Sequence, residues 1–281
     1  MKAERVKELA IIANRVRKNV LTGVYNAKCG HPGGSLSITD VLTVLYFDEM
    51  NIDPKNPKDP KRDRFVLSKG HCAPALYGVL AERGYFDPAE LVNLRKFGHF
   101  LQGHPEMKGV PGVDMSTGSL GQGVAAACGM AKAAKIDGSD YRVYAALGDG
   151  EIEEGQVWES AMFAAHHQLD NLTIFIDNNN LQIDGDIRTV MNPHPIDEKY
   201  KAFGFHVICI DGHDYAAIAD AIAEAKTVKG KPTAVICSTV KGKGVSFMEN
   251  NYGWHGKAPN ADEYAQAMAD LEAIDKELGV L

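Results

Sequence analysis

Two polar clusters follow two apolar runs in the middle of the chain, and their side chains could share a metal ion. Asp149 stands between two glycines after residues 141–147, and Asn179 lies in a row of three asparagines after residues 172–176. If both runs are neighbouring parallel strands, their carboxyl ends meet at one edge of a sheet, where open α/β folds bind ligands. A carboxylate and an amide oxygen are hard ligands that suit Mg²⁺ or Ca²⁺.

A diphosphate group fits the same positions. A magnesium ion bound by so few protein groups completes its coordination with phosphate oxygens and water. The glycines beside Asp149 allow a diphosphate to approach the backbone, and the helix expected after them offers free N–H groups to an anion. A Gly-Asp-Gly sequence alone is more often a plain turn. Its pairing with the asparagine row one βα unit later favours a metal-bridged diphosphate.

Alternating strand and helix patterns would position these residues. Runs typical of β-strands cover residues 141–147, 172–176, 206–210 and 233–237. Helical patterns are expected over residues 3–27, 37–47, 120–135, 155–167, 215–228 and 262–278. Strands that alternate with helices of this length imply an α/β fold with a parallel sheet and helices on both faces. Residues 29–34 are expected to lie between two helices, because glycine and proline end the first one.

Composition limits the classes of protein that remain. The 281 residues, 45% of them hydrophobic, suit one large α/β domain with a C-terminal extension or two small domains. We expect a single domain over residues 1–281 that includes an extension over residues 240–281. The formal net charge of −7 argues against nucleic-acid binding. Five cysteines without a C-x-x-C pair and an N-terminus with recurring charges predict a cytoplasmic protein that does not bind membranes.

Motifs along nearly the whole chain resemble the N-terminal, thiamine-diphosphate-binding half of the transketolase family. Besides the two metal-site elements, these motifs are Gly30-His31-Pro32-Gly33, Ser68-Lys69-Gly70-His71, Gly103-His104-Pro105-Glu106, Thr117-Gly118-Ser119-Leu120-Gly121-Gln122-Gly123, Lys241-Gly242-Lys243-Gly244 and Trp254-His255-Gly256. Several specific motifs in the right order make the match strong. The piece from Gly118 to Gly123 looks superficially like a dinucleotide loop, but it lacks the preceding strand.

The resemblance implies a set of site residues. Asp149, the side chain of Asn179 and the backbone carbonyl of Leu181 would bind Mg²⁺, with Ca²⁺ or Mn²⁺ as alternatives. Gly150 would contact the diphosphate. The remaining cofactor contacts implied by the family are Gly118, Ser119 and Leu120 flanking the cofactor, Ile183 packing against it, and His71 and His255 near the diphosphate and thiazolium ring. His31 and His104 would face substrate hydroxyls, and Glu154 would lie at a subunit junction, coupled to a glutamate of the partner.

The activity implied by the family is transketolase activity, the transfer of a two-carbon ketol unit from a ketose phosphate to an aldose phosphate in the pentose phosphate pathway. Each step moves a proton on or off a sugar oxygen, and a group that titrates near neutrality does this best. Without the family match, any one of the four motif histidines is as often structural as functional. The other histidines match no motif and are predicted to be surface or structural residues. Residues 241–244 are predicted to form a flexible loop and not a phosphate cradle.

The matching family members continue beyond the region that this chain covers, and there they carry the glutamate that activates the cofactor and the arginines that bind sugar phosphates. The resemblance therefore implies that the partner is a C-terminal transketolase subunit, in an α2β2 heterotetramer. Ser119, Cys72 and Trp254 also resemble the split type.

Three alternatives stay open at this point. A close variant is the same chemistry on an unusual sugar phosphate, which the sequence does not separate from the first interpretation. A non-catalytic binding subunit is a second alternative, although the intact Asp149, Asn179 and motif histidines argue against it. The third is the α-subunit of a thiamine-dependent 2-oxoacid dehydrogenase, which has no use for His31 and His104 at substrate hydroxyls.

Overall fold

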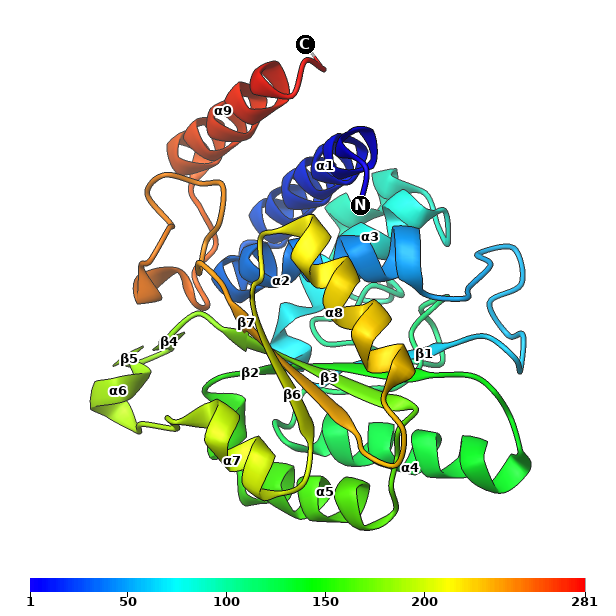
Figure 1. Cartoon of the computed structure of the whole chain (residues 1–281). Helices are drawn as coiled ribbons and strands as arrows, with labels where there is room; N and C mark the ends of the chain where they lie inside the picture. Colours follow the sequence, from blue (N-terminus) through cyan, green and yellow to red (C-terminus); the bar gives the residue numbers. More distant parts are fainter. Residues whose placement is uncertain (281) are drawn as a thin grey trace.

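The computed structural model describes residues 1–280 and contains a five-stranded parallel sheet between two layers of helices (Figure 1). The sheet has the order β1-β2-β3-β7-β6. Its strands are β1 (Arg64–Leu67), β2 (Val143–Gly148), β3 (Leu172–Asn178), β6 (His206–Asp211) and β7 (Thr233–Ser238). Every neighbouring pair in this sheet is parallel. The predicted α/β fold, with helices on both faces of a parallel sheet, is therefore confirmed.

Side chains alternate between the two faces of the sheet and build two separate cores. In β2, Tyr144 and Ala146 belong to the core under the first layer of helices, whereas Val143, Ala145 and Leu147 belong to the core under the second layer. Both faces are dry, as the crossover helices of a parallel sheet require. The helices of the first layer are α1 (Ala3–Ala27), α2 (Pro32–Val44), α3 (Ala73–Arg83) and α8 (Tyr215–Thr227). Those of the second are α4 (Gln122–Asp137), α5 (Gly155–His166) and α7 (Ile196–Ala202).

Short elements lie next to the carboxyl edge of the sheet. The strands β4 (Leu181–Gln182) and β5 (Gly185–Asp186) form an antiparallel pair directly after β3, and α6 (Ile187–Val190) follows them. Among residues 1–280, no helix combines the length and the apolar character needed to cross a bilayer.

The second helix begins earlier than the sequence predicts. It starts at Pro32, where the missing N–H and the fixed φ of proline suit the first helical position, and Gly33 and Gly34 lie inside it. These glycines allow close packing. A Cβ on Gly34 would lie 2.8 Å from Sγ of Cys72, and one on Gly33 would lie 2.9 Å from the carbonyl oxygen of Trp254. The expectation that residues 29–34 lie between helices is wrong from Pro32 onward, because the glycines serve helix packing and not a turn.

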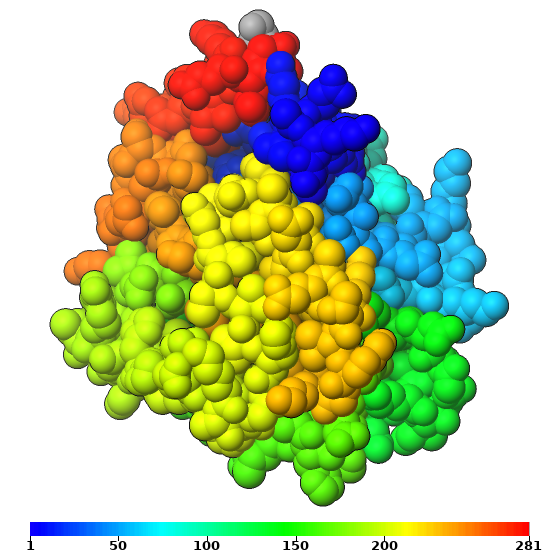
Figure 2. All heavy atoms as spheres, in the orientation of Figure 1, coloured from blue at the N-terminus to red at the C-terminus, as the bar shows by residue number. Residues whose placement is uncertain are grey.

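The last helix, α9 (Ala261–Glu277), packs along α1 and joins the two ends of the chain (Figure 2). The ring of Tyr264 stacks on Tyr25 with centroids 4.2 Å apart. Asn14 donates to Asp275 Oδ1 at 2.6 Å. The helix begins with a capping box, in which Asn260 Oδ1 accepts from the N–H of Glu263 at 2.9 Å and the Glu263 carboxylate accepts from the N–H of Asn260 at 2.8 Å.

Replacing Asn260 by alanine should destabilise the protein, because an N–H group in the first turn of α9 loses its acceptor. We expect Asn260→Ala to lower the free energy of unfolding by about 1 kcal/mol, as measured by urea denaturation. Asn56→Ala, in an exposed loop, is the matched control and should leave this free energy unchanged. Equal effects of the two substitutions would contradict the role of the capping box.

Candidate active site

A cavity of about 260 Å³ lies at the carboxyl edge of the sheet. The register of β2 and β3 places Gly148 beside Asp177, and that of β3 and β7 places Asp177 beside Cys237. Side chains that follow these strand ends therefore meet in space although they are far apart in the sequence. The buried polar side chains on the cavity wall, among the residues that the structure describes, are Lys69, Asp149, Glu151, Asn179 and Lys241.

Asp149 connects the ends of β2 and β3. Its Oδ2 accepts from the N–H of Asn180 at 2.5 Å, and its Oδ1 accepts from the N–H of Gly150 at 2.9 Å. Burial raises the pKa of this carboxyl group to about 7, the negative charge of Asp177 adds to the shift, and Lys241 opposes it. A carboxylate that is so hard to ionise would gain strongly from a cation beside it.

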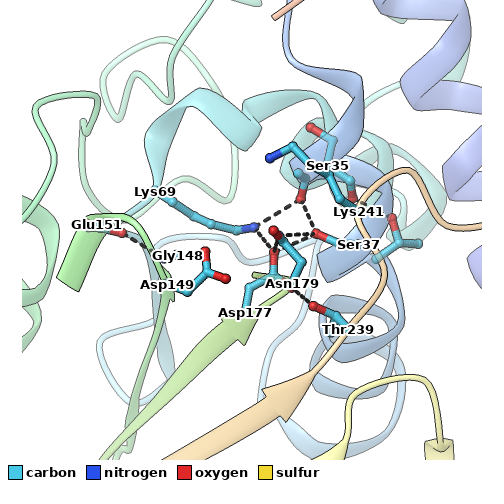
Figure 3. A network of polar contacts seen from close by, with 12 residues as sticks. Ser35, Ser37, Lys69, Gly148, Asp149, Glu151, Asp177, Asn179, Thr239 and Lys241 are labelled. Atoms are coloured by element: carbon cyan, nitrogen blue, oxygen red, sulfur yellow. Dashed lines mark hydrogen bonds and ion pairs between the residues drawn. The ribbon is translucent and has the colours of Figure 1, made fainter. Parts of the chain in front are cut away.

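The amide of Asn179 is oriented by Asp177. Its Nδ2 donates to Asp177 Oδ2 at 3.2 Å, and a carboxylate can only accept, so Oδ1 is the atom that the amide can present elsewhere. Oδ1 accepts from the N–H of Leu181 at 3.1 Å. Asp177 is fully buried and also accepts from Lys69, from Ser37 at 2.5 Å and from Thr239 at 2.5 Å (Figure 3).

The residues present fit a magnesium ion. Asp149 supplies a carboxylate, Asn179 an amide oxygen and Leu181 a backbone carbonyl on one cavity wall, and these hard oxygens are what Mg²⁺ prefers. Within residues 1–280, no group of three or more His, Cys, Asp and Glu side chains could bind a metal ion. A metal ion at this wall would therefore need further ligands from another molecule, as the diphosphate hypothesis requires.

Three imidazole rings line the cavity in close contact. The ring centroids of His31 and His71 are 5.2 Å apart, those of His31 and His255 are 5.5 Å apart, and those of His71 and His255 are 5.1 Å apart. The exposed ring of His104 lies 6.4 Å from His31. It packs against Gly118, where a Cβ would lie 3.0 Å from the His104 ring.

The pKa of each of these four histidines lies below its ordinary value, mainly because of burial. Burial lowers the pKa of His31 to about 4, with further effects from Arg95, His104 and Lys241. Burial and Lys241 lower the pKa of His255 to about 3. The pKa of His71 is also depressed by burial and then by Lys69, and that of His104 by burial and then by Arg95.

Most of the residues predicted for the site lie on the cavity wall. These are His31, His71, Gly118, Leu120, Asp149, Gly150, Asn179, Leu181, Ile183 and His255. Three others, His104, Ser119 and Glu154, are exposed residues outside the wall. Glu154 lies beside the motif loop, since a Cβ on Gly121 would be 3.1 Å from the Glu154 Cβ. The roles assigned to all these residues stay predictions.

Sequence reasoning missed three charged side chains of the wall, namely Lys69, Lys241 and Glu151. Glu151 accepts from Ser68 Oγ at 2.5 Å and from the N–H of Gly121 at 2.9 Å, so it connects three loops. The sequence offered two signals. Glu151 lies two residues after Asp149, and both lysines lie inside the motifs. Nothing local indicates their burial, because it comes from tertiary packing.

Lys241 corrects the expectation of a flexible loop over residues 241–244. Its side chain is only 2% exposed, and Nζ donates to the carbonyl oxygen of Leu181 at 3.0 Å. Nζ also lies 3.1 Å from Nδ1 of His255. The backbone is tied as well, because the N–H of Gly242 donates to the carbonyl oxygen of Gly33 at 2.9 Å. The loop therefore carries a buried cation into the cavity.

Known proteins resemble this chain in sequence and in structure. Residues 9–276 match the family described as transketolase, thiamine diphosphate binding domain. The chain is 46% identical over 271 residues to the 6-deoxy-6-sulfo-D-fructose transketolase subunit SqwG of Clostridium sp. (strain MSTE9), covering 96% of this chain and 98% of that one. It is 42% identical over 273 residues to a subunit of the apulose-4-phosphate transketolase of Phocaeicola vulgatus, covering 97% of each.

A solved transketolase from Pichia stipitis has the same fold. Its crystal structure, of a variant enzyme, superposes with a TM-score of 0.89 at 36% identity. The alignment covers 94% of this chain but only 40% of the Pichia stipitis chain. The chain thus spans less than half the length of that enzyme and nearly the whole length of the two subunits named above.

The raised pKa of Asp149 predicts how stability changes with pH when metal ions are removed. The folded protein keeps this carboxyl group protonated up to about pH 7, whereas its ordinary pKa is 3.8. The free energy of unfolding therefore falls as pH rises from the ordinary pKa through the folded one. Between about pH 5 and about pH 7.5 in EDTA, the unsubstituted protein should lose about 2 kcal/mol more unfolding free energy than Asp149→Asn. Urea denaturation at each pH measures this difference.

The control for this experiment is Asp137→Asn, at an exposed carboxylate, whose pH profile should follow that of the unsubstituted protein. Parallel profiles for Asp149→Asn and the unsubstituted protein would show that Asp149 ionises normally in the folded chain.

Proposed function

This chain belongs to the transketolase family through its thiamine diphosphate binding domain, and we propose that it is the cofactor-binding subunit of a two-component transketolase. It would transfer a two-carbon ketol unit from a ketose phosphate to an aldose phosphate. The observation that carries this proposal is the cavity wall on which Asp149, Asn179 and the Leu181 carbonyl meet beside three imidazoles. Residues 1–281 would act as one domain, with residues 240–281 as its C-terminal extension.

The cavity has groups for each part of a magnesium thiamine diphosphate complex. Asp149, Asn179 and Leu181 would hold the ion, and the Gly150 backbone would contact the diphosphate. Lys241 adds a positive charge at the same wall, 3.0 Å from the Leu181 carbonyl, where it would balance the phosphate charge. Gly118, Leu120 and Ile183 would flank the rest of the cofactor, and the exposed Ser119 between the first two would lie beside it. When bound, thiamine diphosphate supplies the electron sink for cleaving the donor's carbon–carbon bond.

The histidines would bind and orient sugar hydroxyls. Nδ1 of His31 is buried and has no hydrogen-bond partner among the residues that the structure describes, so it is available to a hydroxyl group. Being neutral, His31 can both accept and donate a hydrogen bond. His104 would face the same substrate from the rim of the cavity. His71 and His255 lie deeper, where they would contact the cofactor and move protons at the reacting carbon's oxygen.

A second subunit would complete this site. The two relatives of similar length are both named as subunits. Ile183 is an apolar residue on the cavity wall that remains 58% exposed, and a subunit bound over the cavity would cover it. The exposed carboxylate of Glu154, at the start of α5, would meet the partner's glutamate there. The partner that we propose is a C-terminal transketolase subunit, assembled with this chain in an α2β2 heterotetramer.

The substrate has two candidates. The first is the pair of ketose and aldose phosphates of the pentose phosphate pathway. The second is a different anionic sugar, and it is favoured by the names of the two similar subunits, which specify 6-deoxy-6-sulfo-D-fructose and apulose 4-phosphate. Both candidates would use the same ketol-transfer chemistry and the same residues of this chain.

Isolation of the native complex tests the proposed function. An affinity-tagged copy of the chain, expressed in its native host, should copurify with a C-terminal transketolase subunit, and the complex should show ketol transfer with magnesium and thiamine diphosphate. Xylulose 5-phosphate, fructose derivatives and other anionic ketoses serve as donors, because they separate the two substrate candidates. The chain alone should turn over none of them. Robust activity of the isolated chain would refute the proposal that two subunits share the site. A complex that is inactive on every donor would refute the proposed transketolase activity.

His104 should act on the substrate more than on the cofactor, because it is exposed at the rim and not buried in the cavity. In the complex, we expect His104→Ala to lower kcat/KM for donor cleavage by roughly 100-fold or more, as the loss of a group that moves or binds a proton does, and to change cofactor affinity by less than about threefold. His166→Ala, on the surface of α5, is the control. A larger loss of cofactor affinity than of cleavage would make His104 structural.

A further inference from the structure

We propose that His213 is a positioning residue, which fixes the backbone at Val240 and thereby aims Lys241 into the cofactor cavity. The inference rests on the proposed function, since it assigns a purpose to a group outside the cavity. His213 lies in the loop between β6 and α8, and its side chain is 14% exposed. It matches none of the family motifs.

The hydrogen bonds of His213 define its tautomer. Nε2 accepts from the backbone N–H of Val240 at 2.9 Å, so this nitrogen carries no proton. Nδ1, 2.7 Å from Asp40 Oδ2, must then carry the proton and donate to the carboxylate. Both ring nitrogens are engaged, and the ring connects α2 to the segment after β7.

Asp40 is a rigid anchor for this ring. It is 2% exposed and accepts from Arg17 at 2.6 Å and from the hydroxyl of Tyr215 at 2.6 Å. Burial opposes ionisation of Asp40, but Arg17 and His213 hold its pKa well below the usual value. Helices α1, α2 and α8 thus converge on one carboxylate, and the position of His213 follows from helix packing.

Lys241 follows Val240 directly, so the backbone that His213 fixes is the backbone that carries the lysine. The stem of Lys241 packs on α2, where a Cβ on Gly33 would lie 3.1 Å from Lys241 Cγ. Its Nζ then reaches the Leu181 carbonyl and His255. On the other side, Thr239 donates to Asp177 at 2.5 Å. The N–H of Asn250 also donates to the Lys241 carbonyl oxygen at 2.9 Å, so the His213 bond is one of several that hold this segment. Its particular effect is on the peptide group between Thr239 and Val240, whose rotation would shift the start of the lysine side chain relative to the metal wall.

Two substitutions of His213 separate positioning from a general structural role. The asparagine of His213→Asn can place an N–H near the Nδ1 position and keep the bond to Asp40, but it offers no acceptor to Val240. The longer glutamine of His213→Gln can place its oxygen near the Nε2 position and keep the bond to Val240. In the complex with the partner subunit, His213→Asn should weaken the affinity for magnesium thiamine diphosphate by roughly 10- to 100-fold. His213→Gln should restore most of the affinity.

Binding is measured by titrating the complex with magnesium thiamine diphosphate and following tryptophan fluorescence, and Tm is measured for each variant. His206→Asn, at a histidine of β6 that bonds only Glu224, is the control and should leave affinity unchanged. Unchanged affinity of His213→Asn, or equal losses for the asparagine and glutamine variants, would overturn the inference. If the unsubstituted complex did not bind the cofactor at all, this result would refute the proposed function and not the role of His213 in particular.

A second measurement needs no substitution and therefore does not depend on a variant that folds. Long-range ¹H–¹⁵N NMR spectra of the full chain report which imidazole nitrogen carries the proton. The Nδ1–H tautomer of His213 is expected across neutral pH. The Nε2–H tautomer would exclude the bond from Val240 and overturn the inference.

Discussion

The geometry of the site depends on one buried ion pair, between Lys69 and Asp177. Both side chains are at most 2% exposed, and burying two charges is costly unless each has enough hydrogen-bond partners. Asp177 finds them from α2, from the segment after β1 and from the segment after β7, while Lys69 also donates to the carbonyl oxygen of Gly34 at 3.0 Å. The pair therefore joins α2, the segment after β1, Asn179 after β3 and the segment after β7. Removing either partner would leave an uncompensated charge below the cavity.

Charge balance explains why the cavity suits a metal ion and a polyanion together. Asp149 resists ionisation, the imidazoles resist protonation, and burial also lowers the pKa of Lys241. Burial is the main cause of each shift, so the charged forms of Asp149 and Lys241 are less stable in the cavity than in water. A divalent cation relieves Asp149, and phosphate oxygens relieve the lysine. Without ligands, the charged forms of Asp149 and Lys241 stay unfavourable in the folded chain, and bound magnesium and phosphate would stabilise them.

The sequence was sufficient for strands β2, β3, β6 and β7 and for the meeting of Asp149 with Asn179, because these follow from periodicity and from the geometry of parallel strands. The expected strands did not include the short strand β1. It was insufficient for Lys69 and Lys241. Lysine is normally exposed, and their burial depends on Gly33, Gly34 and Asp177, which come together only in the folded chain. The start of α2 was misplaced for a related reason, since glycine ends a helix by local preference but here permits close packing. The lowered pKa values of His31, His71 and His255 depend first on burial and then on neighbouring charges that include Lys69 and Lys241, and both causes arise only in the folded chain.

The packing of α9 on α1 bears on how the protein can be modified. Figure 1 shows the start of α1 and the end of α9 on the same side of the molecule, beyond the helical layer, with the β4–β5 pair at a separate edge. Affinity tags, fluorophores or flexible tethers attached at either end would thus begin far from the cavity. Immobilisation through these ends would leave the ligand-binding edge accessible to small molecules and to an incoming protein.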